Sequence, residues 1–353
     1  MSLLKKKDLI GLDIGTDSLK LARIKKSSKG YGLVKAGLKH LPQGAITEDK
    51  IIDRQSVIQA IKQLLQEQKI TTKDVATSIS GRSVIVKRIK LPQMTEEELG
   101  ESITYEAEQY IPFDINDVNL DFQIMNNARQ KEEGQMDVLL VAVKKERIQD
   151  IVSIITGAGL IPSIVDIDVF ALENQYELNY LKDMNNYIVL LDIGADTMNM
   201  NILWEGQTIF TRDASLGGNN YSKILQNKLG LDLTQIEKIK SGETVEGVTE
   251  EQIIPLRESF YEEIFSEIQR SFDYFRATAD DTPLSKILLS GGTSKINAID
   301  QVLAQHFEME VEKSDPFKKI DINPNQFNTD WLAQVSPMMA IVVGLALRRV
   351  DDR

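Results

Sequence analysis

The chain contains no cysteine and only two histidines among its 353 residues. The first absence excludes disulfide bridges, thiolate metal sites and a cysteine nucleophile, and is typical of proteins from a reducing compartment. Because His40 and His306 are the only imidazoles, we do not expect a histidine-rich metal site or a Ser/His/Asp triad. The chemistry of this protein must rest on other side chains.

Basic residues are fewer than acidic ones. The chain has 41 Lys and Arg against 53 Asp and Glu, a formal net charge of −12. Proteins that bind nucleic acid normally neutralise phosphates with clustered Lys and Arg, so we expect no nucleic-acid partner. The 42% of hydrophobic residues and 27% of charged residues are typical of a globular protein, and the length suits two or three domains or one large two-lobed fold.

Long apolar runs are missing as well. Met1–Lys7 is basic but lacks the apolar run of a secretory signal. The stretch Trp331–Leu347 includes Gln334, Ser336 and Pro337 and falls short of the ~20 apolar residues of a membrane span. We therefore expect a cytoplasmic chain in which the second half of that stretch forms a buried helix.

One motif occurs twice. Leu12–Ser18 reads LDIGTDS and Leu191–Thr197 reads LDIGADT, so both copies fit LDIG-x-D-[ST]. Each copy follows one apolar run and precedes another, which predicts strand, tight turn and strand. The chain is expected to contain two lobes that open with the same hairpin.

The pattern between and after the copies predicts alternating strands and helices. Before the second copy we expect helices over 56–65, 96–110, 148–155 and 170–180, strands over 75–79, 84–89, 118–124, 137–143 and 164–167, and a polar loop over 126–134. After it we expect a strand pair ending near 215, helices over 219–229, 235–241, 251–278, 295–307 and 338–349, and a strand over 287–289.

An Asp at the end of a buried strand, followed by Gly and a hydroxyl residue in a tight turn, suits phosphate and magnesium binding. The Gly lets backbone N–H groups approach phosphate oxygens, and the Asp holds Mg²⁺ through water. An ordinary hairpin explains one copy equally well, but not two copies at matching positions. Lys20 follows the first turn and can supply a point charge to the phosphates.

Three further patterns are weaker taken alone. Ser290–Thr293 and Gly217–Gly218 each lie between a strand and a helix, where glycine allows close approach of a ligand or simply starts a helix. Glu237 and Lys240 are three residues apart on a short helix, where they can hold a ribose or form a surface ion pair.

In order along the chain, the two LDIG turns, the Ser290–Thr293 turn and the final helix with Ala340, Gly344 and Ala346 resemble the phosphate 1, phosphate 2, adenosine and second connecting motifs of the actin-like ATPase superfamily. The resemblance implies an α/β fold that is actin-like (ribonuclease H-like), with duplicated mixed-sheet lobes around a nucleotide cleft. It implies ATP or ADP with Mg²⁺ as cofactors. Asp13 and Asp192 would hold the metal through water. The nucleotide-binding residues it implies are Asp13, Gly15, Thr16, Asp17, Ser18, Lys20, Asp192, Gly194, Ala195, Asp196, Thr197, Gly217, Gly218, Glu237, Lys240, Gly291, Gly292 and Thr293.

Two segments narrow the resemblance. Tyr105–Phe113 and Val165–Leu172 are similar to segments of the PilM family of type IV pilus assembly proteins, and FtsA carries a similar insertion. The resemblance implies a cytoplasmic protein at the inner-membrane face, reaching the membrane only through a partner. That partner would be the N-terminal cytoplasmic peptide of PilN, with other platform proteins or self-association in addition.

The sequence departs from the superfamily pattern at two places. Ala195 stands where a Gly or hydroxyl residue often follows the second turn, which removes one phosphate donor. The hydrolytic Gln or Glu of actin-like enzymes has no match, and Asp168, then Asp166, are the nearest candidates for a catalytic residue. Both can also be simple polar residues at a strand-to-helix junction, so we expect weak ATPase activity at most.

By this resemblance the first lobe is expected over 1–82, an inserted α+β subdomain like 1C of FtsA over 83–165, and a connecting segment over 166–186. The second lobe is expected over 187–335, with its smaller part at about 230–282, and a terminal helix over 336–353 returns to the first lobe. Two alternatives stay open: a polymerising division protein like FtsA, and a small-molecule kinase of the same superfamily. The first usually carries an amphipathic membrane helix at one end, which we do not find in the terminal residues Arg348–Arg353.

Overall fold

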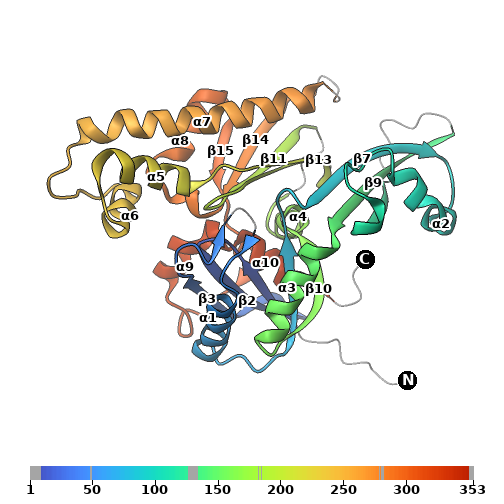
Figure 1. Ribbon diagram of the computed structural model, residues 1–353, viewed down its shortest axis with the longest axis horizontal. Helices are drawn as coiled ribbons and strands as arrows, with labels where there is room; N and C mark the ends of the chain where they lie inside the picture. Colours follow the sequence, from blue (N-terminus) through green and yellow to red (C-terminus); the bar gives the residue numbers. More distant parts are fainter. Residues whose placement is uncertain are drawn as a thin grey trace.

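The computed structural model describes residues 9–47, 50–125, 134–181, 183, 185–277, 279 and 282–349. It shows two lobes built on separate sheets and a third, smaller sheet at the side of the molecule (Figure 1). Most of the loop expected over 126–134 lies outside the described residues.

The first lobe is a six-stranded mixed sheet in the order β10-β6-β1-β2-β3-β16. Strands β1 and β2 form the hairpin of the first LDIG copy, and β6 pairs parallel to β1. The strands are β1 (Ile10–Ile14), β2 (Ser18–Ser27), β3 (Gly30–His40), β6 (Asp74–Ile79), β10 (Ile161–Ile167) and β16 (Ile320–Asp321). A separate small hairpin joins β4 (Ile46–Thr47) to β5 (Lys50–Ile51).

Helices cover both faces of this sheet. α1 (Arg54–Glu67) and α3 (Lys145–Gly157) bury their apolar residues against one face. α9 (Thr329–Val335), the 3₁₀ turn η4 (Ser336–Met339) and α10 (Ala340–Leu347) cover the other face. The expected helices over 56–65 and 148–155 and the final buried helix are thus confirmed.

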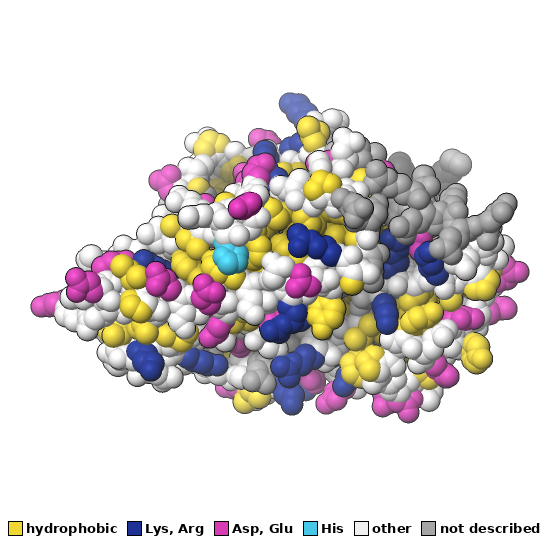
Figure 2. All heavy atoms as spheres, turned by 90° about the horizontal axis from the view of Figure 1, so that it is seen from above, with side chains coloured by type: hydrophobic (Ala, Val, Ile, Leu, Met, Phe, Trp, Pro, Cys, Tyr) yellow, Lys and Arg dark blue, Asp and Glu magenta, His cyan; other side chains and the backbone are white. Residues whose placement is uncertain are grey.

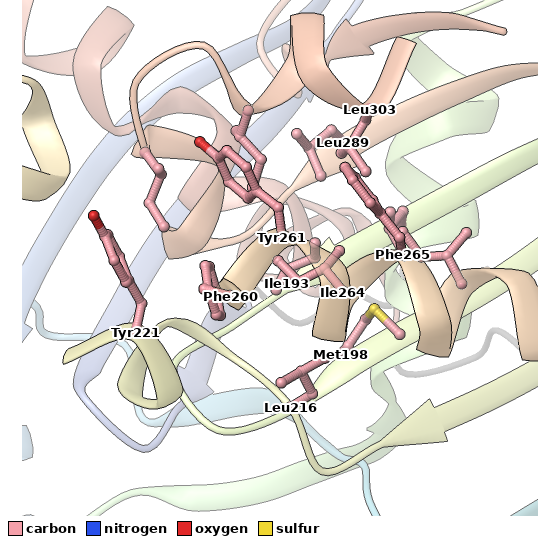
Figure 3. Packing of buried hydrophobic residues seen from close by; sticks show 14 of the residues in the cluster. Ile193, Met198, Leu216, Tyr221, Phe260, Tyr261, Ile264, Phe265, Leu289 and Leu303 are labelled. Carbon is pink, nitrogen blue, oxygen red and sulfur yellow. The ribbon is translucent and has the colours of Figure 1, made fainter. Parts of the chain in front are cut away.

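The second lobe repeats the plan with a five-stranded sheet in the order β13-β12-β11-β14-β15. Its strands are β11 (Tyr187–Ile193), β12 (Met198–Trp204), β13 (Gln207–Ala214), β14 (Leu284–Ser290) and β15 (Glu310–Lys313), and its helices are α5 (Gly218–Leu229), α6 (Leu233–Ser241), α7 (Glu250–Arg276) and α8 (Ile299–Phe307). α7 lies across the sheet with Phe260 and Ile264 packed toward Ile193 and Met198 (Figure 3). A 3.6-residue apolar period along α7 produces this single buried stripe.

The third sheet has three antiparallel strands in the order β7-β9-β8. They are β7 (Val84–Pro92), β8 (Val118–Met125) and β9 (Gln135–Lys144), with the helix α2 (Glu96–Ala107) and the 3₁₀ turn η1 (Ile115–Asp117) between β7 and β8. A capping box between Thr95 and Glu98 starts α2, and Leu99 and Ile103 join it to the small core of this sheet.

The observed packing suggests other positions for two of the expected boundaries. α3 and β10 fall within the expected insertion over 83–165, yet Ile151 and Ile154 pack in the first-lobe core and β10 pairs with β6. Likewise β16 pairs with β3, so the chain re-enters the first lobe well before residue 336. We propose boundaries near 144 and 314 in place of 165 and 335.

The helix expected over 295–307 is present, but the prediction of its first residue was wrong. Residues Gly292–Lys295 form the 3₁₀ turn η3, and α8 begins only at Ile299. The reason is local: Ala298 has φ of 60°, a left-handed conformation that interrupts a right-handed helix.

The helical stretch Thr329–Leu347 is long and apolar enough to cross a membrane by length and composition. The expectation that it falls short was therefore wrong by the criterion of length. In the structure 61% of its most apolar window is buried, and α10 packs against β1, β2 and α4 (Asp168–Asn179). It serves here as a core helix of the first lobe.

α4 and α10 cross where the two lobes meet. The Ala171 carbonyl oxygen lies so near Gly344 that a Cβ added there would stand 1.8 Å from it. Ala171 and Leu345 belong to a buried cluster that also contains Ile188 and Leu190 of the second sheet. The two lobes therefore share one apolar junction beneath the cleft.

Candidate functional site

The two LDIG copies form the same turn in the two lobes. The Gly15 N–H donates to the Ser18 carbonyl at 3.2 Å, and the Gly194 N–H donates to the Thr197 carbonyl at 2.8 Å. In each copy an Asp stands on the first strand just before the turn, and both are buried: Asp13 and Asp192. The sequence repeat is thus also a structural repeat.

The carboxylates of the two turns converge on Lys20. The Lys20 ammonium lies 3.1 Å from the Asp13 carboxylate. Burial alone would lower the pKa of Lys20, but the charges of Asp13, Asp192 and Asp17 outweigh it and raise the pKa. Lys20 is therefore a fixed cation at the bottom of the cleft, as expected for a phosphate-binding lysine.

Burial raises the pKa of Asp192 to about 7. The neighbouring carboxylates Asp168 and Asp13 act in the same direction, whereas Lys20 and a hydrogen bond from the Ser290 hydroxyl at 2.8 Å oppose the rise. A cation placed between these carboxylates would lower the pKa again. Among the described residues, no three Asp, Glu or His side chains converge closely enough to hold a metal ion directly.

Asp168 begins α4 beside the first turn. Burial raises its pKa to about 6, Asp13 adds to the rise, and hydrogen bonds to Ser78 and Ser80 oppose it. The Asn199 amide also donates to the Asp168 carboxylate at 3.3 Å. This carboxyl group is thus held in the cleft with a pKa close to neutral.

Asp166 lies two residues earlier but is engaged elsewhere. The Arg348 guanidinium is 3.0 Å from its carboxylate, and the Ile167 N–H donates to its second oxygen at 2.9 Å. Burial raises the pKa of Asp166, although the positive charge of Arg348 acts to lower it. The structure therefore does not bring Asp166 together with Asp168, because Asp166 lies on β10 and pairs with Arg348, whereas Asp168 is the first residue of α4, where the backbone passes from strand to helix.

The remaining residues of the first turn differ in exposure, and only Asp17 is exposed. Asp17 accepts a hydrogen bond from His40, whose Nδ1 lies 2.9 Å from the Asp17 carboxylate, and this contact raises the pKa of His40 and lowers that of Asp17. Thr16 is partly buried, and Ser18 is buried at the start of β2. Asp17 is thus already paired, which the motif alone does not reveal.

The glycines of the second lobe gather around the second turn. A Cβ at Gly217 would stand 2.4 Å from the carbonyl oxygen of Ala195. A Cβ at Gly291 would stand 2.3 Å from the carbonyl oxygen of Ile193, and Gly291 also has a φ of 87°. The Gly218 N–H and the Thr293 hydroxyl both donate to the Gly194 carbonyl, at 3.0 and 2.7 Å. Only glycine fits at these two close approaches.

Other second-lobe candidates border the same place. Asp196 accepts a hydrogen bond from the Asn219 amide at 2.8 Å, and Ala195 contributes its carbonyl oxygen to the Asn219 N–H at 2.8 Å. Lys240 pairs with Glu237 at 2.7 Å, and its ammonium would lie 3.7 Å from a Cβ at Gly218. Gly292 starts η3 next to Gly291.

The two lobes face one another through these groups. Lys240 contributes to the lowered pKa of Asp17, and Glu237 to the raised pKa of His40, so these second-lobe charges lie near the first-lobe turn. The charged groups of the two turns, Asp13, Lys20 and Asp192, also influence one another's surroundings, and we call the place where the two turns face each other the cleft. The cofactor-binding candidates named above lie on or beside the two turns. Which of them contact a ligand stays a prediction.

Sequence reasoning missed three polar residues of the site. His40 and Asn219 pair with the two turns, and Asn199 holds Asp168. For Asn199 a signal did exist, because β12 reads MNMNILW and Asn in a fully buried strand needs a polar partner. For His40 no local pattern indicates the pairing, which depends on the β2–β3 register that places Ser18 opposite His40.

A hollow of about 700 Å³ adjoins the cleft. We call it the partner hollow; it is bordered by Gly81 and Arg82, by Val84–Val86 of β7, by Pro112 and Phe113, and by 211–215 of β13 and the loop after it. Asp168 and Thr197 border the hollow, and both belong to the surroundings of the turns: Asp168 interacts electrostatically with Asp13 and Lys20, and the Thr197 carbonyl closes the second turn. The segment Tyr110–Phe113 follows the end of α2 at Ala107 and contributes Pro112 and Phe113 to the hollow.

Two sheets with the same hairpin, joined by crossing helices around a cleft that carries paired turns, define an actin-like protein. Comparisons with known proteins agree. The family model for the type IV pilus assembly protein PilM matches residues 11–350. The chain therefore belongs to the PilM family, as the sequence resemblance indicated.

Solved structures show the same fold. The structure of the PilM-PilN type IV pilus biogenesis complex matches with a TM-score of 0.86 and 27% identity, covering 98% of this chain and 100% of that one. EutJ from Carboxydothermus hydrogenoformans, an ethanolamine utilization protein, matches at 0.53 and 14% identity over 96% and 88% of the two chains. MreB5 of Spiroplasma citri, bound to ADP, matches at 0.52 and 11% over 96% and 94%. The predicted actin-like fold is confirmed.

Proposed function

We propose that this protein binds Mg-ATP in the cleft and the N-terminal cytoplasmic peptide of a PilN-type membrane protein in the partner hollow. It would act at the cytoplasmic face of the inner membrane, which it reaches through that partner. The observation that carries the proposal is that Asp168 and Thr197 border the hollow and also belong to the surroundings of the turns. The nucleotide would then influence the shape of the hollow, a shift between populations of lobe arrangements.

The residues of the cleft fit a nucleotide phosphate chain. The glycine cradle around Gly217 and Gly291 brings bare backbone close to the turn of the second lobe, and the Lys20 ammonium provides a cation. Magnesium would neutralise phosphate charge, and Asp13 and Asp192 would hold its water shell. The amides of Thr16 and Ala195 would donate to phosphate oxygens, since the Gly15 and Gly194 amides already close their turns.

Hydrolysis would be slow. Asp168 is the carboxylate of the described residues best placed to orient a water, and a pKa of about 6 leaves it ionised at neutral pH. Asp166 would not share this role, because Arg348 holds it. This assignment replaces the two-residue prediction with Asp168 alone.

The partner hollow suits an extended peptide. β7 is an edge strand of the three-stranded sheet and β13 is an edge strand of the five-stranded sheet. Consecutive residues of both strands border the hollow, so their backbone edges can pair with an added strand. Val84, Val86 and Phe113 offer apolar contacts to alternate side chains of such a peptide.

The hollow is also bridged by polar contacts between the lobes. The Gly81 N–H donates to the Asp213 carboxylate at 2.7 Å, and Arg82 donates to the Ser215 hydroxyl at 3.0 Å. These two contacts would break or shift if the lobes moved apart. A peptide bound there would therefore respond to the lobe arrangement that the nucleotide favours.

Calorimetric titration with a synthetic PilN-type N-terminal peptide tests the proposal, with and without Mg-ATP. The wild type should bind the peptide, and Mg-ATP should change its Kd by about fivefold or more. Thr211→Arg, which fills the hollow from β13, should weaken binding by about tenfold or more. Thr47→Arg is the matched control, since the exposed Thr47 of β4 does not border the hollow.

Equal peptide binding by Thr211→Arg and the wild type would remove the partner hollow as the binding site. If the wild type binds no peptide with or without Mg-ATP, the proposal that a PilN-type peptide is the partner is wrong. A Kd that does not respond to Mg-ATP would remove the link between cleft and hollow alone.

A further inference from the structure

A second hollow of about 580 Å³ lies beside the partner hollow along α7. We call it the acidic groove. Asn220 of α5 and Ser259, Glu262, Glu263 and Ser266 of α7 border it. It also shares Ser215, Glu267 and Arg270 with the partner hollow, so that the two form one continuous depression.

The charges that border the acidic groove are unbalanced. Three glutamates, Glu262, Glu263 and Glu267, stand against one cation, Arg270. Arg270 already pairs with Glu267, which also lies 3.4 Å from the Arg212 guanidinium. Within the described part of the chain, the exposed carboxylates of Glu262 and Glu263 have no ion-pair or hydrogen-bond partner. The carboxylates of Glu262 and Glu263 therefore give the groove a net negative charge, beside Glu267, whose charge is balanced by Arg270 and Arg212.

This imbalance is local. The face of the molecule on which α7 lies carries acidic, basic and apolar side chains side by side, without one continuous patch of a single sign (Figure 2). The net charge of −12 alone would attract any cation weakly and without preference for a site. A groove of defined shape with unpaired carboxylates can instead select where positive charge binds.

We propose that the acidic groove binds a basic segment that continues the peptide held in the partner hollow, with its Lys or Arg side chains paired to Glu262 and Glu263. This inference rests on the proposed function, because it needs the preceding part of the same peptide in the partner hollow. The occupant is thus a peptide with an apolar part followed by a basic part.

Two arguments support this choice of occupant. Cytoplasmic segments of membrane proteins carry an excess of Lys and Arg near the membrane, so a short N-terminal peptide is expected to become basic toward its span. An extended chain advances about 3.3 Å per residue, so a few residues suffice to pass from one hollow to the next across Glu267 and Arg270. The charge expected of the peptide thus complements the charge of the groove.

The test compares two labelled synthetic peptides by fluorescence anisotropy: the PilN-type N-terminal segment alone, and the same segment followed by Lys-Arg-Lys-Arg. The protein variants are the double variant Glu262→Gln, Glu263→Gln and, as matched control, Glu251→Gln. Glu251 is an exposed glutamate in the first turn of the same helix and does not border the groove. Circular dichroism checks that each variant folds as the wild type does.

We expect the basic extension to tighten binding to the wild type and to Glu251→Gln by about three- to tenfold at low salt. The gain should disappear in the double variant and in 0.5 M salt, where exposed charges are screened. An equal gain in the double variant, or no gain in the wild type, would overturn the inference while leaving the proposed function intact. Failure of the short peptide to bind would overturn the proposed function, and this inference with it.

Discussion

Asp166 and Asp168 are separated by one residue and have different surroundings. Asp168 lies among Asp13, Lys20 and Asn199 in the cleft, whereas Asp166 pairs with Arg348. Both pKa values are raised by burial, but only the Asp168 carboxylate interacts with Asp13 and Lys20, the side chains that we propose hold the nucleotide. The sequence does not distinguish these two carboxylates, but their different neighbours in the structure do.

Replacing Asp168 tests this separation. Asp168→Asn should lower the slow ATP turnover by about tenfold or more, because the amide cannot accept a proton from water. In the wild type, kcat/KM should fall as the pH drops below about 6, since protonation of Asp168 removes the acceptor. Steady-state release of phosphate between pH 5 and 8 measures both effects.

The control for that variant is Asp166→Asn. It should change turnover by less than about twofold at any pH, while lowering stability through the loss of the Arg348 ion pair. A loss of turnover in Asp166→Asn equal to that in Asp168→Asn would show that the assignment is wrong.

The pairing of His40 with Asp17 predicts a pH-dependent contribution to stability. The pKa of His40 is raised in the folded state, so the contribution is fully present below the unfolded value of about 6.5 and is lost as the pH rises through the folded value. Both side chains are more than half exposed, so the contribution is below about 1 kcal/mol.

Urea unfolding of the wild type and His40→Gln checks this. The variant should be less stable at pH 5.5 and match the wild type at pH 8.5. A stability difference of the same size at both pH values would mean that the imidazole contributes by packing and not by charge.

At the scale of elements, α4 and α10 cross in close contact at the junction between the lobes. A Cβ at Gly344 would meet the carbonyl oxygen of Ala171 at 1.8 Å, on a rigid helix backbone that cannot give way. Gly344→Ala should therefore destabilise the protein by ~1–3 kcal/mol and separate the crossing helices.

Gly100→Ala is the matched helical control for this prediction. Gly100 lies in α2 with only Phe122 near, at 3.8 Å from a Cβ, so alanine should stabilise by ~0.5–1 kcal/mol through helix propensity. Thermal unfolding of both variants compares them. A Gly344→Ala variant as stable as the wild type would contradict the observed crossing.

Elements were predictable from the sequence where the pattern is local. The LDIG repeat predicted both hairpins, and the apolar period predicted α1, α3 and α7. The start of α8 was not predictable, because nothing in the sequence marks Ala298 as left-handed. The boundary that we propose near 314 could not be predicted either, since β16 has two residues and only its pairing with β3 assigns it to the first sheet.

At the scale of the whole molecule, the cleft combines groups that are distant in sequence. Lys20 interacts electrostatically with Asp168 and with Asp192, although more than 140 residues separate Lys20 from either of them in the sequence. The sequence predicted the turns and Lys20 by resemblance to actin-like proteins. It did not predict the partner hollow, which forms only where β7 and β13 of two different sheets approach each other.

The most direct test of this account is calorimetric titration with Mg-ATP of the wild type, Asp13→Asn and Asp192→Asn, with Asp117→Asn as an exposed control outside the cleft. The wild type and the control should bind one nucleotide, and both cleft variants should bind about tenfold or more weakly, since each loses a carboxylate that holds magnesium. Removing Mg²⁺ with EDTA should weaken binding to the wild type to a similar extent. A wild type that binds no nucleotide, or cleft variants that bind as tightly as the control, would contradict the central claim that the paired turns form a nucleotide site.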